Sequence, residues 1–255
     1  MMSIRLALSG LIVFLGGCQG LGLARLSSDP AAPLRTSRQV VLVVSDNWDA
    51  QTAQMQCFDR QAGGPWQRVG EPVLVSIGRT GLAWGRGLHG EPTLPGPIKQ
   101  EGDGKAPAGI FELLSAFGYV PQDDQLGINL PYIHLTDDVV GVDDVKSRYY
   151  NQIVWLDQVN KDWDSAETMR RPDGLYQWGV LVGHNVPPKA GAGSCIFLHI
   201  WRGAGMPTAG CTAMSTQDMK RLITWLDPQY RPVLVQLPRE EYQKLASTWF
   251  LPVRE

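Results

Sequence analysis

Short apolar runs separated by turns that contain glycine and proline dominate the first two thirds of the chain. Residues 39–46, QVVLVVSD, are rich in β-branched side chains, which predicts a buried first strand. Residues 55–60 and 66–78 flank the turn signal Gly63-Gly64-Pro65, which predicts two strands joined by a turn. Similar runs predict a strand that starts at residues 110–113 and core strands at residues 180–185 and 194–201.

Helical spacing becomes prominent only toward the C-terminal end. Apolar residues recur at helical intervals after the capping signal Ser215-Thr216, with Asp218 in the first turn; they are Met219, Leu222, Ile223 and Leu226. We expect a further strand at residues 231–237 and a terminal helix at residues 239–249. Because strands come first and helices are late and few, the pattern predicts an α+β, mainly β fold.

Residues 120–178 have no clear period and are dense in Asp, Tyr and Trp. We expect an elaborated loop region here, with a short helix around residues 165–170. Two groups of polar and aromatic side chains are read first as networks that stabilise these loops: one is Asp143, Asp144, Ser147, Tyr150 and Asn151, and the other is Trp163, Ser165 and Glu167.

The first residues indicate an export signal instead of part of the fold. Arg5 precedes the apolar run at residues 6–15, which is too short to span a bilayer comfortably. The sequence Leu15-Gly16-Gly17-Cys18 matches a lipobox, so residues 1–17 are expected to be removed and Cys18 to carry lipid. Gln19 at the next position favours the inner leaflet of the outer membrane, in the periplasm. Residues 19–38 are expected to be a flexible tether to a single domain at residues 39–255.

Composition narrows the function further. The chain has 255 residues, 44% of them hydrophobic and 19% charged, and its net charge of -2 argues against nucleic acid as a partner. Without Cys18, three cysteines remain, namely Cys57, Cys195 and Cys211. In an oxidising compartment an odd number suggests one disulfide and one free thiol. The sequence leaves open whether Cys57 and Cys195 are bonded or both reduced.

His199 has two cysteines near it in the sequence. If residues 194–201 are extended, Cys195 lies roughly 13 Å from His199 along the strand, which is beyond hydrogen-bond reach. Cys211 follows a loop that contains glycines and a proline, and such a loop can fold back to the strand end. We therefore expect His199 to activate Cys211 and lower its pKa, with amides around Gly210 and Thr212 forming an oxyanion hole. The alternative is a core histidine beside a small buried cysteine.

Two motifs resemble the L,D-transpeptidase catalytic domain family (YkuD). Thr208-Ala209-Gly210-Cys211 after a strand histidine is similar to one family signature, and residues 105–111, KAPAGIF, are similar to a second. Residues 76–90 resemble in particular a lipoprotein subgroup with IFLH strands. The similarity extends over residues 39–237 and implies a domain of β-sandwich type.

The resemblance implies a nucleophilic Cys211, a base His199 oriented by Thr208 or a backbone carbonyl, and no cofactor or metal. The expected substrates are peptidoglycan stem peptides: a stem is held as a thioester and passed to an amine to form a 3-3 cross-link. Water as acceptor gives a carboxypeptidase or an amidase that releases wall proteins.

Departures from the family pattern affect substrate binding most. Ala209 stands where a second histidine is usual, and an arginine that follows the cysteine in many members is missing. We expect Arg202 to replace that arginine, and Thr212, His184 and Asn185 to contact substrate. For His184-Asn185 a turn-forming pair is the alternative, and for the acidic clusters stem recognition is the alternative. An inactive wall-binding lipoprotein is the rival from another functional class.

Overall fold

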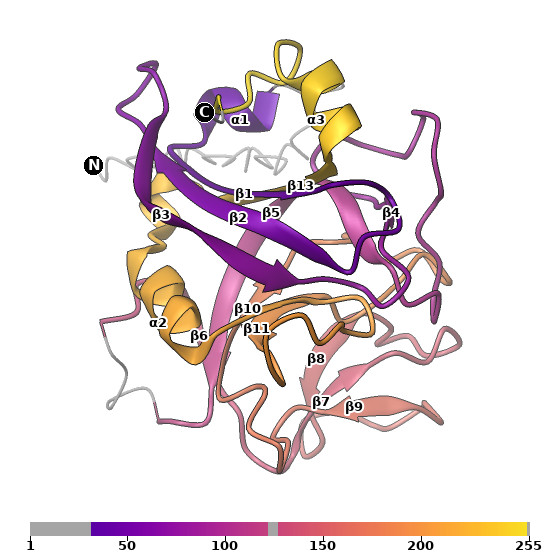
Figure 1. The fold of residues 1–255 in the computed structure, drawn as a ribbon. Coiled ribbons are helices and arrows are strands. Elements are labelled where there is room, and N and C mark those ends of the chain that lie inside the picture. The colour runs from indigo at the N-terminus through magenta and orange to yellow at the C-terminus, as the bar shows by residue number, and fades with distance from the viewer. Residues whose placement is uncertain (1–31, 122–126, 254–255) are drawn as a thin grey trace, which may run out of the picture.

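The computed structural model describes residues 32–121 and 127–253. Figure 1 shows a mainly β molecule with helices at its periphery, as the sequence predicts. In chain order the elements are α1 (Ala32–Thr36), β1 (Gln39–Ser45), β2 (Thr52–Asp59), β3 (Gln67–Ser76), β4 (Leu82–Trp84), β5 (Ala106–Gly118), β6 (Tyr132–His134), β7 (Val139–Val142), β8 (Gln152–Trp155), β9 (Ala166–Thr168), β10 (Trp178–Val182), β11 (Phe197–Ile200), β12 (Thr212–Met214), α2 (Thr216–Trp225), the 3-10 helix η2 (Pro228–Tyr230), β13 (Val233–Pro238) and α3 (Arg239–Leu245).

The large sheet closes on itself. Its strand order is β10-β11-β12-β3-β2-β1-β13-β5-β4, and β10 also pairs with β5. The long β5 therefore completes a circuit, so the two layers expected of a sandwich are parts of one continuous sheet. The first strand, β1, lies between its sequence neighbour β2 and the distant β13, with Val40 opposite Val233 in parallel register.

The main hydrophobic core is built from the alternating apolar positions of these strands and the buried side of α2. Ser215 is the N-cap of α2 and its side chain accepts a hydrogen bond from the Asp218 N–H, as the capping signal predicts. Met219, Leu222 and Ile223 are buried beneath the helix. The terminal helix is shorter than predicted, because α3 ends at Leu245, although Trp249 beyond it is still buried.

Residues 139–168 contain a second sheet of three strands in the order β8-β7-β9. The helix expected at residues 165–170 is wrong: residues 166–168 form β9, which pairs with residues 140–142 of β7. This pairing across distant residues overrides the local helical preference of Ala166 and Glu167. The expected elaboration of residues 120–178 thus has strands of its own, and β6 of the same region joins the large sheet.

The last part of the tether expected at residues 19–38 is instead folded against the domain. Residues 32–36 form α1, and Leu34 is fully buried in the main core. The Arg35 guanidinium lies 4.8 Å from the centre of the Phe250 ring, which places α1 beside the C-terminal segment, as Figure 1 shows. The signal peptide, Cys18 and the rest of the tether lie outside the described residues. Within the described ranges, no helix has the length and apolar character to cross a membrane.

Candidate active site

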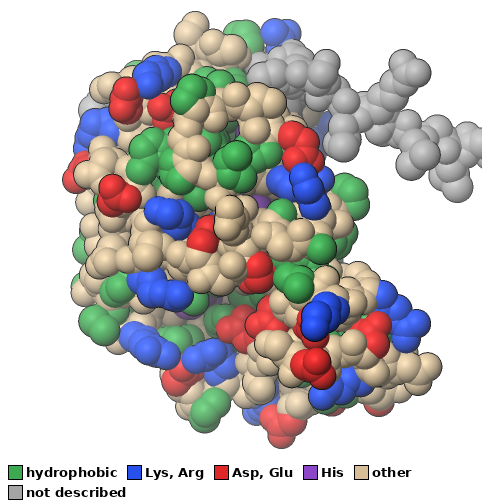
Figure 2. Space-filling model, turned by 90° about the vertical axis from the view of Figure 1, so that its right-hand side faces the viewer, with side chains coloured by type: hydrophobic (Ala, Val, Ile, Leu, Met, Phe, Trp, Pro, Cys, Tyr) green, Lys and Arg blue, Asp and Glu red, His purple; other side chains and the backbone are tan. Residues whose placement is uncertain are grey.

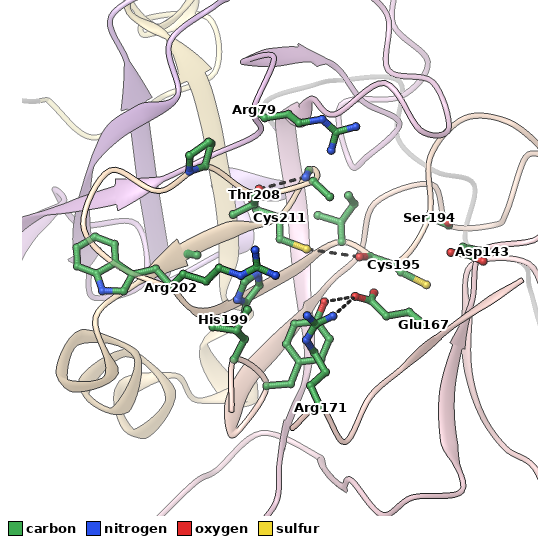
Figure 3. A pocket seen from close by; sticks show the side chains of 18 of the residues that line it. Arg79, Asp143, Glu167, Arg171, Ser194, Cys195, His199, Arg202, Thr208 and Cys211 are labelled. Carbon is green, nitrogen blue, oxygen red and sulfur yellow. Dashed lines mark hydrogen bonds and ion pairs between the residues drawn. The ribbon is translucent and has the colours of Figure 1, made fainter. Parts of the chain in front are cut away.

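A cavity of about 680 Å³ contains both members of the predicted Cys–His pair. Figure 2 shows one face of the molecule, hollowed between the main body and a projecting lobe, with acidic side chains at the edge of the hollow. Figure 3 shows Cys211 and His199 among the side chains of the cavity. Its charged and hydroxyl-bearing lining residues are Arg79, Lys99, Glu101, Asp143, Glu167, Arg171, Tyr176, Ser194, Arg202 and Thr208.

Parallel pairing of β11 with β12 brings the cysteine to the histidine. His199 is opposite Ala213, and Leu198 is opposite Thr212, so Cys211 lies one position before β12 on the face that carries His199. The Phe197 N–H donates a hydrogen bond of 3.3 Å to the Cys211 Sγ, which fixes the sulfur over the start of β11. The loop of residues 201–210 therefore folds back as predicted.

Cys195 is not part of the strand. β11 begins at Phe197, and Cys195 has a left-handed backbone with φ of 53°. The estimate of strand length between Cys195 and His199 therefore rests on an incorrect premise. The Cys195 side chain lines the cavity, and its carbonyl accepts a hydrogen bond of 3.6 Å from the Cys211 thiol. All three cysteines of the described residues are free, so Cys57 and Cys195 form no disulfide.

The His199 ring has a defined tautomer. Its Nδ1 lies 2.7 Å from the Ile200 carbonyl oxygen. Because a carbonyl only accepts, Nδ1 carries the proton and Nε2 keeps a free lone pair. Burial lowers the pKa of His199 to about 4, so the ring is neutral at ordinary pH. The Tyr176 ring contacts the imidazole edge to face, with centroids 5.1 Å apart.

Burial has the opposite effect on the thiol. It raises the pKa of Cys211 to about 12, and the negative charge of Glu167 raises it further, while the Phe197 N–H favours the thiolate. The expected lowering of this pKa is therefore wrong for the free protein, because loss of solvation outweighs the hydrogen bond. The resting pair is a neutral thiol beside a neutral imidazole.

Thr208 organises the turn before the cysteine. Its hydroxyl donates to the Cys211 carbonyl at 2.6 Å and accepts from the Gly210 N–H at 3.1 Å. It does not orient His199, since the Ile200 carbonyl does so. The Gly210 N–H is thus used within the turn, whereas the Cys211 N–H has no acceptor among the described residues. Gly210 has φ of 155°, and a Cβ there would lie 3.0 Å from the Lys105 carbonyl oxygen.

The four expected substrate residues are separated by the structure. Arg202 lines the cavity, with 65% of its side chain exposed and a weak ion pair of 3.9 Å to Asp173. Thr212 is buried, faces away from the cavity and donates to Gln236 at 2.7 Å, because it alternates with Cys211. His184 and Asn185 are also buried outside the cavity, where they bind backbone groups of residues 189–193. They fit the alternative of a turn-forming pair.

The polar groups of residues 143–167 have different roles. Asp144, Ser147, Tyr150 and Asn151 bind loop backbone or side chains, in keeping with stabilising networks. Asp143 and Glu167 instead line the cavity. The sequence places them in two separate clusters, and only the antiparallel pairing of β7 with β9 shows that they are neighbours. Lys99, Glu101 and Arg79 also reach the cavity from segments that the sequence does not connect with it.

The Tyr176 hydroxyl donates to Glu167 Oε1 at 2.6 Å, and Arg171 lies 3.4 Å from the same oxygen. Burial raises the pKa of Glu167. In the part of the chain that the structure describes, no group of three His, Cys, Asp or Glu side chains is arranged to hold a metal ion.

A closed, mainly β domain whose cavity contains a cysteine and a histidine has the features of a catalytic domain that uses a thiol. The family model described as the L,D-transpeptidase catalytic domain (YkuD) matches residues 48–235. The chain therefore belongs to this family, whose members act on peptidoglycan stem peptides. No curated protein matches the chain with significant similarity.

Proposed function

We propose that this protein is a cysteine-dependent L,D-transpeptidase in which Cys211 is the nucleophile and His199 the general base. The observation that carries the proposal is the shared cavity: Cys211 and His199 lie on one face of neighbouring strands, with His199 Nε2 unprotonated. A base with a free lone pair beside a protonated thiol can take its proton as the sulfur attacks.

The reaction proceeds in two balanced steps. The Cys211 sulfur attacks the carbonyl of the third residue of a stem tetrapeptide, and its proton passes to His199. The C–N bond to the fourth residue breaks, and His199 returns the proton to the leaving amine, which leaves a thioester. An amine of a second stem then attacks the thioester, its proton passes through His199 to the sulfur, and a 3-3 cross-link and a free thiol result.

The free Cys211 N–H supports stabilisation of the oxyanion. It follows Gly210, whose φ of 155° favours glycine, and it is the amide of the nucleophile itself. The Thr208 hydroxyl binds the Gly210 N–H and the Cys211 carbonyl, so it holds the peptide groups on both sides of this amide before substrate arrives. A positioned donor of this kind contributes about 3 kcal/mol to transition-state stabilisation in other acyl-transfer enzymes.

The activity is tested by incubating the protein with purified peptidoglycan stems and analysing the products. Incubation of stem tetrapeptides with the protein is expected to give 3-3 dimers and free D-Ala, and Cys211→Ala is expected to give neither. Tripeptide monomers without dimers would make the protein a hydrolase with the same nucleophile. If Cys211→Ala kept the activity of the wild type, the proposed chemistry would be refuted.

A carbapenem distinguishes an enzyme from an inactive binding protein and identifies the nucleophile. We expect one covalent adduct in the intact mass, lost in Cys211→Ala and kept in Cys195→Ala. Cys195 is the matched control because it lines the same cavity. Loss of the adduct in a folded Cys195→Ala variant would contradict the assignment.

We also propose that Cys18 is lipidated and holds the protein at the inner leaflet of the outer membrane. The lipobox at residues 15–18 supports this location. Cys18→Ser is expected to move the protein from the membrane fraction to the soluble periplasmic fraction. Equal membrane association of both forms would refute the anchor.

A further inference from the structure

Two carboxylates face the cavity on one side of the nucleophile. Gly141 of β7 is paired with Glu167 of β9, and Asp143 follows two positions after Gly141. Asp143 directly follows the end of β7, and Asp143 and Glu167 both line the cavity. Figure 3 shows Asp143 and Glu167 on one side of Cys211, with Arg202 on the other.

Gly141, opposite Glu167 and two positions before Asp143, is packed against Cys195. A Cβ at this position would lie 3.0 Å from the Cys195 Sγ, so this face of the small sheet packs directly against Cys195. The Cys195 carbonyl in turn accepts a hydrogen bond from the Cys211 thiol. The carboxylates are therefore connected to the nucleophile through a single intervening residue, Cys195, which occupies the space that a side chain at Gly141 would need.

Neither carboxylate is fully satisfied by the protein. Asp143 makes no hydrogen bond or ion pair within the described residues, and its Oδ1 is buried without a partner. Tyr176 and Arg171 both bind Glu167 through Oε1, which leaves Oε2 without a partner in the same part of the chain. A buried carboxylate oxygen without a donor is unfavourable, so this position calls for a cationic hydrogen-bond donor.

Of the cations that line the cavity, Lys99, Arg171 and Arg202 have other partners, and Arg79 lies elsewhere in the cavity. Lys99 Nζ lies 2.6 Å from Asp103, and Arg171 lies 2.6 Å from Asp173. Arg202 also pairs with Asp173, and Figure 3 shows Arg79 on the side of Cys211 away from Glu167. The missing cation is therefore expected from outside the chain.

We propose that Asp143 and Glu167 are the residues that bind the side-chain ammonium of the donor residue whose carbonyl Cys211 attacks, and so determine specificity at this position. The inference rests on the proposed function, because it assumes an acyl donor in this cavity. An ammonium has three donors, which suits two carboxylate oxygens with free lone pairs.

The same contact has a second consequence for Cys211. The charge of Glu167 disfavours the thiolate, and a bound ammonium compensates this charge. A donor with a cationic side chain thus makes the thiol easier to deprotonate when it binds. A neutral donor of the same shape leaves the field of Glu167 in place.

Matched synthetic tetrapeptides with lysine or norleucine at position three test the selection, because norleucine lacks the ammonium. We expect wild-type kcat/KM to favour lysine at least about tenfold, as for a charge-assisted hydrogen bond. Asp143→Asn and Glu167→Gln are each expected to reduce this ratio several-fold. Asp143→Asn breaks no protein hydrogen bond, and Gln at position 167 still accepts from Tyr176. Asp137→Asn is the control, because this carboxylate is 94% exposed and does not line the cavity.

The rate at which neutral iodoacetamide alkylates Cys211 provides a second test. This rate should not rise if Glu167 only stabilises the structure. Glu167→Gln is expected to raise the alkylation rate of Cys211 several-fold at pH 8 while lowering transfer from the lysine donor. Equal lysine-to-norleucine ratios in wild type, Asp143→Asn and Glu167→Gln would overturn the inference, with the proposed function intact if transfer persists. Absence of both transfer and the Cys211 carbapenem adduct in wild type would instead overturn the proposed function.

Discussion

At the scale of single residues, the hydrogen bond from His199 Nδ1 to the Ile200 carbonyl determines which ring nitrogen is basic. The backbone supplies this contact, so no acidic side chain is needed to orient the ring. A neutral carbonyl stabilises an imidazolium less than a carboxylate does, and burial disfavours the charged ring. These conditions make His199 a base that is already deprotonated near neutral pH.

The pH dependence of acylation follows from this environment. Protonation of His199 removes the base, so the rate is expected to rise with pH through the pKa of about 4 and to be nearly level from pH 6 to 8. Carbapenem acylation rates between pH 4 and 8 measure this. His199→Ala should be slower by roughly 100-fold or more at pH 7. A midpoint near 6.5 would indicate that the ring is solvated in the working enzyme.

Thr208→Val is expected to affect catalysis more than stability. Loss of the hydroxyl frees the Gly210 N–H and the Cys211 carbonyl, which lets the nucleophile and its amide shift. We expect a loss of roughly 10- to 100-fold in kcat/KM from this misplacement. The unfolding free energy should fall by about 1 kcal/mol. Thr224→Val, which removes an exposed hydroxyl bonded to the Lys220 carbonyl, is the matched control and should leave activity unchanged.

At the scale of elements, patterns formed by residues that are close in sequence predict the helices and strands well. The β-branched run predicts β1, the turn signal predicts the pairing of β2 with β3, and Ser215 predicts the start of α2. Strand alternation also shows that Thr212 must face away from Cys211, a consequence that the expected role of Thr212 overlooks.

Features that need distant partners are not predictable in this way. The β9 strand has helix-forming residues and extends only because β7 pairs with it. The left-handed Cys195 carries no local signal, since glycine is the usual residue there. The high pKa of Cys211 depends on burial in the folded domain and on the charge of Glu167, and a motif around Cys211 indicates neither. The sequence thus predicts that Cys211 and His199 come together, but it does not predict their environment.

The N-cap of α2 provides a test of one element alone. Ser215→Ala removes the acceptor of the Asp218 N–H and should lower the unfolding free energy by about 1 kcal/mol. Urea unfolding measures the change. Because α2 does not line the cavity, kcat/KM should stay as in wild type, and a large loss of activity would show that the helix influences the site.

At the scale of the whole molecule, the segment before β1 is part of the domain. Leu34 of α1 is fully buried, although the composition of residues 19–38 favours a tether. The folded unit therefore begins before Gln39 and includes α1, which contacts the C-terminal segment through Arg35. A boundary drawn at residue 39 on sequence grounds removes part of the core.

Leu34→Ala tests this extension of the domain. The cavity left in the core is expected to cost about 2 to 5 kcal/mol of unfolding free energy, measured by urea denaturation. Leu94→Ala is the control, because Leu94 is 36% exposed, and it should change the midpoint little. Equal midpoints for both variants would mean that α1 is dispensable for folding.

The pairing of β1 with β13 has a consequence for biogenesis. A chain that emerges with its N-terminus first keeps the β13 edge of β1 vacant until residues 233–238 arrive. Closure of the sheet therefore waits until β13 has been synthesised, and a chain that ends before β13 lacks the strand that joins β1 to β5. Such long-range pairing slows folding, so the contact between β1 and β13 is expected to form late.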